Sequence, residues 1–284
     1  DHPGGRDNTF FDTAHVWATR LLGDTDFVGT FAAAADAGAW SLIIVLDDYA
    51  GASDDSHVRV TTYPAVPFGD LEAPQWDGDD TWDISAEGFV TASGSGPIGG
   101  GGGGVGGAGG GAVGGGGAGG IEVGEPVSQS DDAYVRDGQL VARLPRAVVA
   151  FRLLPVQFVV RLRSVVLTAT IDEVGGRLIL RDGVLAGGID NNDGQLLLSS
   201  LRDTRGEPIC AGDLFYDPTQ SLFCDRSDLD VSGGTVGQIC NAASFAIGFD
   251  AETALLGNVV AAPQPAAFCD PIFLDPLYHE CSTL

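Results

Sequence analysis

The chain has 284 residues and a formal net charge of −25 at pH 7. This length allows one large domain or two ordinary ones, and a hydrophobic content of 44% excludes a disordered chain. The acidic balance argues against nucleic acid, which needs a basic surface, and against anionic membranes. No apolar run reaches the ~20 residues of a membrane span.

Two residue types are missing from the chain, methionine and lysine. Without an initiator methionine, Asp1 is expected to follow a removed signal peptide, so we expect a secreted, extracellular or cell-surface protein. The lack of lysine excludes Schiff-base chemistry on that side chain.

The N-terminal segment, residues 1–39, is predicted to be an arm with short helices. Apolar spacing predicts a first helix between Phe10 and Leu22. A second helix is predicted over 27–38 and ends at Gly38, since glycine accepts the left-handed conformation of a helix C-terminus.

From Trp40 the apolar period changes to that of strands. Residues 40–49 and 57–66 are predicted strands. The acidic segment 50–56 between them is the predicted turn. Residues 74–85 and 88–94 are aromatic and acidic and are predicted to be strand and loop.

A glycine-rich stretch covers residues 94–124, and its inner part, 99–120, contains only glycine, alanine and valine. Composition alone favours a flexible linker. Linkers, however, usually mix glycine with serine or charged residues. The alternative is an ordered insertion, packed against its own chain or a neighbouring copy.

Consecutive strands are predicted over residues 131–189, broken by turns at 136–138, 174–176 and 181–184. This pattern predicts a mainly β fold, an antiparallel β-sandwich-like structure with short helices. The predicted β-rich core spans 40–200, interrupted by the glycine-rich insertion.

The C-terminal segment, 201–284, is predicted to be loop-rich and held by disulfides. A short helix followed by a loop is predicted over 194–210, and a further helix near 242–249 or 251–256. Cysteines that are candidates for disulfides in an exported protein are Cys210, Cys224, Cys240, Cys269 and Cys281. Because five is odd, one thiol is free, paired between chains, or matched outside this chain.

Six blocks of the chain carry a resemblance to known proteins: residues 41–65, 74–84, 131–145, 181–189, 201–210 and 237–251. They resemble a series found in uncharacterised exported, lipoprotein-like β-rich proteins of myxobacteria and related bacteria. The resemblance implies export and a β-rich fold, without a known activity. The chain departs from the pattern by its glycine insertion and by lacking an N-terminal cysteine that could carry a lipid.

Two acidic segments are candidates for calcium, which prefers several oxygen ligands from a tight loop. Asp228, Asp230 and Ser232 have the spacing that opens an EF-hand loop, but Ile239 stands where its bidentate glutamate would be. Asp190 and Asp193 belong to a similar, shorter segment. Aspartates also bend turns without any metal, so calcium is the one cofactor considered and none is required.

Two indoles, Trp76 and Trp82, alternate with aspartates, as on many sugar-binding surfaces; the alternative is packing on a sheet or at a subunit contact. No nucleophile elbow or phosphate loop is present. We therefore expect no enzyme, although an exported hydrolase using two carboxylates stays open. The favoured function is an exported structural protein that self-assembles with its own copies at the cell surface or in an extracellular filament. The alternative is a calcium-dependent glycan- or surface-binding module.

Overall fold

The computed structural model describes residues 10, 14–16, 19, 26–66, 73–90, 124–153, 156–200, 210, 216–231 and 240–261. Nine strands dominate this part of the chain. The strands are β1 (Leu42–Asp47), β2 (Asp55–Pro64), β3 (Thr81–Ser85), β4 (Gln129–Arg136), β5 (Gln139–Leu153), β6 (Val156–Val174), β7 (Arg177–Asp190), β8 (Ala242–Ala251) and β9 (Leu255–Val260). The helices are α2 (Phe27–Asp36), the 3-10 helix η2 (Ala86–Gly88), α3 (Asn191–Ser200) and α4 (Tyr216–Asp225).

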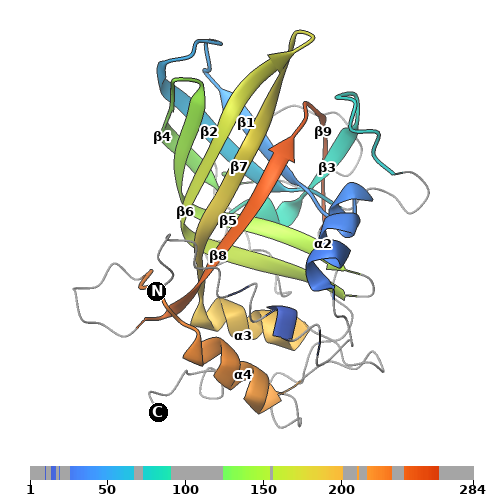
Figure 1. Cartoon of the computed structure of the whole chain (residues 1–284), viewed down its shortest axis with the longest axis vertical. Helices are drawn as coiled ribbons and strands as arrows, with labels where there is room; N and C mark the ends of the chain where they lie inside the picture. Colours follow the sequence, from blue (N-terminus) through green and yellow to red (C-terminus); the bar gives the residue numbers. More distant parts are fainter. Residues whose placement is uncertain are drawn as a thin grey trace, which may run out of the picture.

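The prediction of a mainly β, antiparallel fold is confirmed. Seven strands form one curled sheet in the order β1-β2-β4-β5-β6-β7-β8, and each neighbouring pair is antiparallel (Figure 1). The other two strands, β3 and β9, form a small parallel sheet. Because β9 pairs with a strand some 170 residues earlier, the small sheet joins the two halves of the chain.

Two of the three predicted hairpin turns are confirmed by their backbone conformation. Asp137 and Gly138 have φ of 50° and 75°, and Gly175 and Gly176 have 63° and 79°. Positive φ at both central residues gives a turn whose twist matches that of the flanking strands.

The third predicted turn, 181–184, is wrong. The chain continues through this segment as β7, and Asp182 at φ 50° marks a bulge. The register with β6 shifts between Thr168 and Thr170, and that with β8 between Leu180 and Gly183. A residue in the left-handed conformation therefore bends a strand here without reversing it.

The main hydrophobic core lies on one face of the seven-stranded sheet. Helices cover it through Phe31 of α2, Leu197 of α3 and Phe223 of α4. Phe151 of β5 is central to an aromatic cluster, with ring centroids 5.0 Å from Phe31 and 6.4 Å from Phe245. Figure 1 shows α3 and α4 beside one end of the sheet and α2 along its side.

The opposite face of the sheet is also covered near the middle of β5. Residues 147–151 are all buried, and since successive strand side chains point to opposite faces, both faces are shielded there. The covering part includes β3 and η2, whose Trp82, Ile84 and Ala86 are buried outside the main core. This second, smaller layer makes the fold sandwich-like.

Among the predicted helices, the one over 27–38 is confirmed as α2, with Gly38 at φ 72° after its end. The helix expected near 242–249 or 251–256 is wrong, because β8 and β9 occupy those residues. Ala243, Phe245, Ile247 and Phe249 all contact the main core, which is the two-residue period of a strand. The sheets thus extend beyond residue 200, to Val260.

Only part of the predicted N-terminal helix lies within the described residues. Phe10, residues 14–16 and Thr19 are helical, while the rest of the predicted helix lies outside the described residues. The helix predicted after residue 194 already begins at Asn191. No helix had been predicted at α4.

The glycine-rich stretch lies almost wholly outside the described residues, but both its flanks are described. Val90 donates its N–H to the Glu125 carbonyl, and Val127 donates to the Gly88 carbonyl, both at 2.8 Å. Phe89 and Pro126 form an antiparallel bridge. The chain therefore returns, after residues 91–123, to the place it left, so the stretch is an insertion within the β fold.

Candidate functional site

The most unusual surface feature of the described fold is the free edge of β1, which we call the β1 edge (residues 42–47). This strand ends the order of the main sheet and pairs on one side with β2. The pairing from Leu42–Pro64 to Asp47–Arg59 has no bulge. Among the described elements, none other than β2 lies alongside it.

Two hydrogen bonds determine which way the backbone groups of β1 point. Ala65 donates to the Ser41 carbonyl, and Thr62 donates to Ser128 next to β4. In an antiparallel pair, residues alternate between facing the partner strand and facing away from it. The backbone N–H and C=O of Thr62 point toward β4. The backbone groups of Ile44, its partner in β1, therefore point away from β2.

The outward-facing backbone groups of β1 therefore belong to Leu42, Ile44 and Leu46. Pro64 fits this alternation. It lies opposite Leu42 and has no N–H, so it could not donate a hydrogen bond to a neighbouring strand. Within the described part of the chain, no residue accepts from or donates to these outward groups. Each of the three residues thus presents an N–H and a C=O at the open side of the sheet.

Among the described residues, the β1 edge lacks the features that usually prevent edge-to-edge pairing. Edge strands that are protected from such pairing are typically short, bulged or covered, or they contain proline or lysine. The strand sequence LIIVLD contains neither proline nor lysine, and Asp47 at its end is its only charge. Leu42, Ile44 and Leu46 pack against the core, while Ile43 and Val45 lie on the opposite face. The arrangement can accept a further strand.

The tryptophan-containing acidic segment forms a compact loop before β3. Trp82 is buried at 2% exposure, whereas Trp76 is 41% exposed and packs on it with ring centroids 5.6 Å apart. Trp76 has φ of 54°, and its N–H donates to the Asp80 carboxylate at 2.7 Å. Its indole N–H donates to the carbonyl of Asp36 at the end of α2. One indole is therefore core and one is a surface group.

A partly buried ion pair joins the main sheet to η2. The Arg161 guanidinium on β6 lies 3.2 Å from the Glu87 carboxylate, and the two side chains are 27% and 13% exposed. Burial raises the pKa of Glu87, and the charge of Arg161 opposes part of that rise. The Nε of Arg161 is buried and has no hydrogen-bond partner.

The predicted calcium candidates Asp190 and Asp193 lie together at the junction of β7 and α3. The guanidinium of Arg163 lies close to both carboxylates. Arg163 approaches Asp190 at 3.9 Å and Asp193 at 3.6 Å. Burial raises the pKa of Asp193, and the charges of Arg163 and Arg161 oppose this. Asp190 also accepts the N–H of Asn192, an arrangement that begins α3.

The second calcium candidate has a different partner. Both carboxylate oxygens of Asp228 accept hydrogen bonds from Ser244, at 2.7 Å from its N–H and 2.8 Å from its hydroxyl. Asp230 is exposed, and Ser232 lies outside the described residues. Among the described residues, no group of three or more histidine, cysteine, aspartate or glutamate side chains could hold a metal ion.

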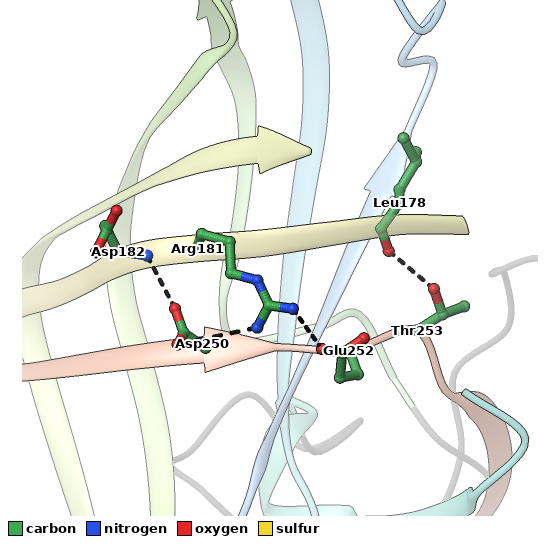
Figure 2. Close-up of polar contacts among 6 residues, drawn as sticks. All are labelled: Leu178, Arg181, Asp182, Asp250, Glu252 and Thr253. Carbon is green, nitrogen blue, oxygen red and sulfur yellow. Dashed lines mark hydrogen bonds and ion pairs between the residues drawn. The ribbon is translucent and has the colours of Figure 1, made fainter. Parts of the chain in front are cut away.

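A set of polar contacts holds the end of β8 and the residues after it against β7, as Figure 2 shows. Arg181 lies 3.9 Å from Asp250 and 2.8 Å from Glu252. Asp250 also accepts the N–H of Asp182, the bulge residue, and the Thr253 hydroxyl donates to the Leu178 carbonyl. These contacts direct the chain from β8 to β9 and are structural in character.

The cysteine candidates fall in three places. Cys210 and Cys224 are among the described residues, the latter in α4. Cys240 is half-buried and carries a free thiol. Cys269 and Cys281 lie outside the described residues.

Sequence reasoning singled out the tryptophans and acidic segments but missed the β1 edge and the Arg161–Glu87 pair. The run LIIVL was a visible signal for a strand, but not for its place at the edge.

No helix in the described part of the chain is long and apolar enough to cross a membrane.

Comparison of the chain with protein-family models, with curated proteins and with solved structures found no match.

Proposed function

We propose that this chain is an exported structural protein that self-assembles with its own copies at the cell surface or in an extracellular filament. The observation that carries the proposal is the β1 edge, which no other described strand covers and whose outward groups at Leu42, Ile44 and Leu46 can pair with another strand. Adding a strand to an open edge is a common way for proteins to bind. The proposal assigns a second contact to the glycine-rich insertion.

Export is part of the same proposal and has its own support. Five of the six blocks that resemble exported β-rich bacterial proteins include described strands, among them β1, β2 and β8. We also propose that disulfides hold the C-terminal segment, with Cys210 and Cys224 among the bonded cysteines. Such bonds persist in oxidising, extracytoplasmic surroundings.

The test compares two lysine substitutions on the same face of the main sheet. Val45→Lys places a charge beside the joint, whereas Val166→Lys places it on the central strand β6, where the valine is already exposed. Sedimentation velocity over a range of concentrations measures association. Because each copy carries −25, the runs are made in 0.5 M salt, at roughly 4 Å screening length, as well as in 0.15 M.

We expect the native protein to form species larger than a monomer, and electron microscopy to show them as ordered particles or filaments. Val45→Lys should weaken association at least about tenfold, equivalent to about 1.4 kcal/mol, and Val166→Lys should leave it unchanged. A native protein that stays monomeric at every concentration and salt removes the proposal. Equal loss in both variants would assign the effect to charge rather than to the edge.

The second candidate, a calcium-dependent glycan- or surface-binding module, is favoured by one observation. Trp76 presents an exposed indole that packs against the buried ring of Trp82. Asp77 and Asp79 follow it closely in the same loop. An exposed aromatic face beside carboxylates can stack on a sugar and accept its hydroxyls.

Its test has two parts. Melting with calcium and with a chelator should differ if calcium binds the folded state, because such binding raises the midpoint. Trp76→Ala should abolish the binding of oligosaccharides on a glycan array, while an alanine at exposed Tyr134 should not. The absence of both a calcium shift and glycan binding rejects this candidate.

A further inference from the structure

We propose that two copies of this chain join through their β1 edges as an antiparallel pair, related by a two-fold axis at Ile44. The inference rests on the proposed self-assembly and specifies its joint. The two seven-stranded sheets would then form one continuous sheet across the pair. The partner is a second copy because the edge is complementary to itself in strand direction, backbone groups and side chains.

The direction of the strands favours this joint over a head-to-tail one. Every neighbouring pair from β1 to β8 is antiparallel, so the two outer strands of the main sheet run the same way. Joining β8 of one copy to β1 of the next by simple repetition would need a parallel pair, which is slightly weaker. Ser244, Phe245 and Ala246 of β8 also already have interactions.

The outward-facing groups determine the register of the pair. Centring on Ile44 pairs Ile44 with Ile44 of the second copy, and Leu42 with Leu46 of the second copy. All the outward N–H and C=O groups of β1 then find partners. A shift of the axis to residue 43 or 45 leaves Leu46 or Leu42 without a partner in the other β1.

The side chains fit the same register. Ile43 lies opposite Val45 of the second copy, a pairing of β-branched side chains that stabilises sheets. Ser41 lies opposite Asp47 of the second copy, so a hydroxyl faces a carboxylate. No two like charges are opposed. Moving the axis to residue 45 would instead place Asp47 against Ile43.

Disulfide trapping can test the register. Ile43→Cys and Val45→Cys are made separately in a Cys240→Ser background, so that the free thiol does not react. In the proposed pair these positions form a non-hydrogen-bonded pair, with Cα atoms about 4.5 Å apart. That spacing is within the range that a disulfide can bridge.

We expect a covalent dimer when the two variants are mixed and mildly oxidised, and none from either variant alone. Val166→Cys, on the same face of a central strand, measures random collisional cross-linking. A dimer from Ile43→Cys alone would place the axis at residue 43, and one from Val45→Cys alone at residue 45; either result overturns the register. If a variant does not melt cooperatively, Ser41→Cys mixed with Asp47→Cys tests the same register.

Sedimentation of the same unoxidised samples separates the two proposals. Association without cross-linking in any mixture overturns the two-fold β1 joint and leaves self-assembly standing. A protein that neither associates nor cross-links overturns both.

Discussion

The Arg161 guanidinium and the Glu87 carboxylate, 3.2 Å apart, fasten η2 and the small sheet to the main sheet. Arg161→Met removes the cation and leaves the Glu87 carboxylate shielded from water without its partner. We expect a loss of about 1–2 kcal/mol at pH 7, below the 3–5 kcal/mol of fully buried pairs, because Arg161 keeps some exposure. Urea denaturation measures the free energy of unfolding.

The matched control is Arg59→Met, which removes a somewhat closer pair at the surface. Arg59 lies 2.9 Å from Asp131, with both side chains largely exposed. Exposed pairs contribute about 0–1 kcal/mol, so this variant should stay close to the native stability. Similar losses in both variants would mean that the loss comes from the arginine stem rather than from shielding of the charge.

The raised pKa of Glu87 predicts a particular pH dependence. Because burial raises the pKa above its ordinary 4.5, the folded protein holds this proton to a higher pH than the unfolded chain does. The stability from the protonated form is present below pH 4.5 and is lost as the pH rises through the folded pKa. Melting midpoints measured from pH 4 upward should therefore decline less in Glu87→Gln than in the native protein.

Asp193 has a raised pKa for the same physical reason, so Glu87→Gln should retain part of the decline. Adding Asp193→Asn should remove a further part. An identical pH profile in the native and Glu87→Gln proteins would contradict the assignment.

The β4–β5 turn offers a test that involves backbone conformation alone. Gly138 has φ of 75°, and a Cβ there would meet no atom within 4 Å. Gly138→Ala should therefore destabilise the fold by about 1 kcal/mol through the left-handed backbone. Gly248→Ala, in β8 with only one backbone oxygen at 3.8 Å, should be neutral or slightly stabilising. Chemical denaturation of both variants shows whether the loss is confined to Gly138.

Deleting residues 99–120 should leave the fold intact, because the hydrogen bond between Val90 and Glu125 closes the insertion outside the deleted part. Shortening the loop about threefold should change stability by no more than about 1 kcal/mol. Melting and sedimentation provide the two readouts.

The same deletion separates the two proposed contacts. A pair related by a two-fold axis is closed, so growth into a filament needs another contact. We expect the deletion variant to keep the pair and lose larger assemblies. Filaments of unchanged length would exclude a role for the insertion.

Local sequence patterns were sufficient for most strands and for the tight turns. Asp-Gly at 137–138 and Gly-Gly at 175–176 favour positive φ, which a hairpin turn requires, and both turns are present. The same Asp-Gly pair at 182–183 lies in a bulge, because the strands on either side of β7 continue past it. A dipeptide sets the local φ, whereas neighbouring strands decide whether the chain reverses.

The features that matter for the proposed function depended on the order of the strands, which no local pattern contains. The run from Leu42 to Leu46 reads as a strand in any position, and only the sheet order leaves its outer side open. Glu87 and Arg161 are 74 residues apart, so their approach follows from the covering layer. By contrast, the alternation of Phe245, Ile247 and Phe249 was a strand signal in the sequence that the helix prediction overlooked.

The pairing of β3 with β9 also affects how the chain can fold. The buried Trp82 lies in β3, and its pairing partner in β9 is Leu256. Contacts between residues so far apart slow folding, typically to milliseconds or seconds. A ribosome-bound chain would lack this closing strand until Val260 has been synthesised. Native structure is therefore expected to form late, and refolding followed by tryptophan fluorescence should show a slow phase that Leu256→Pro removes.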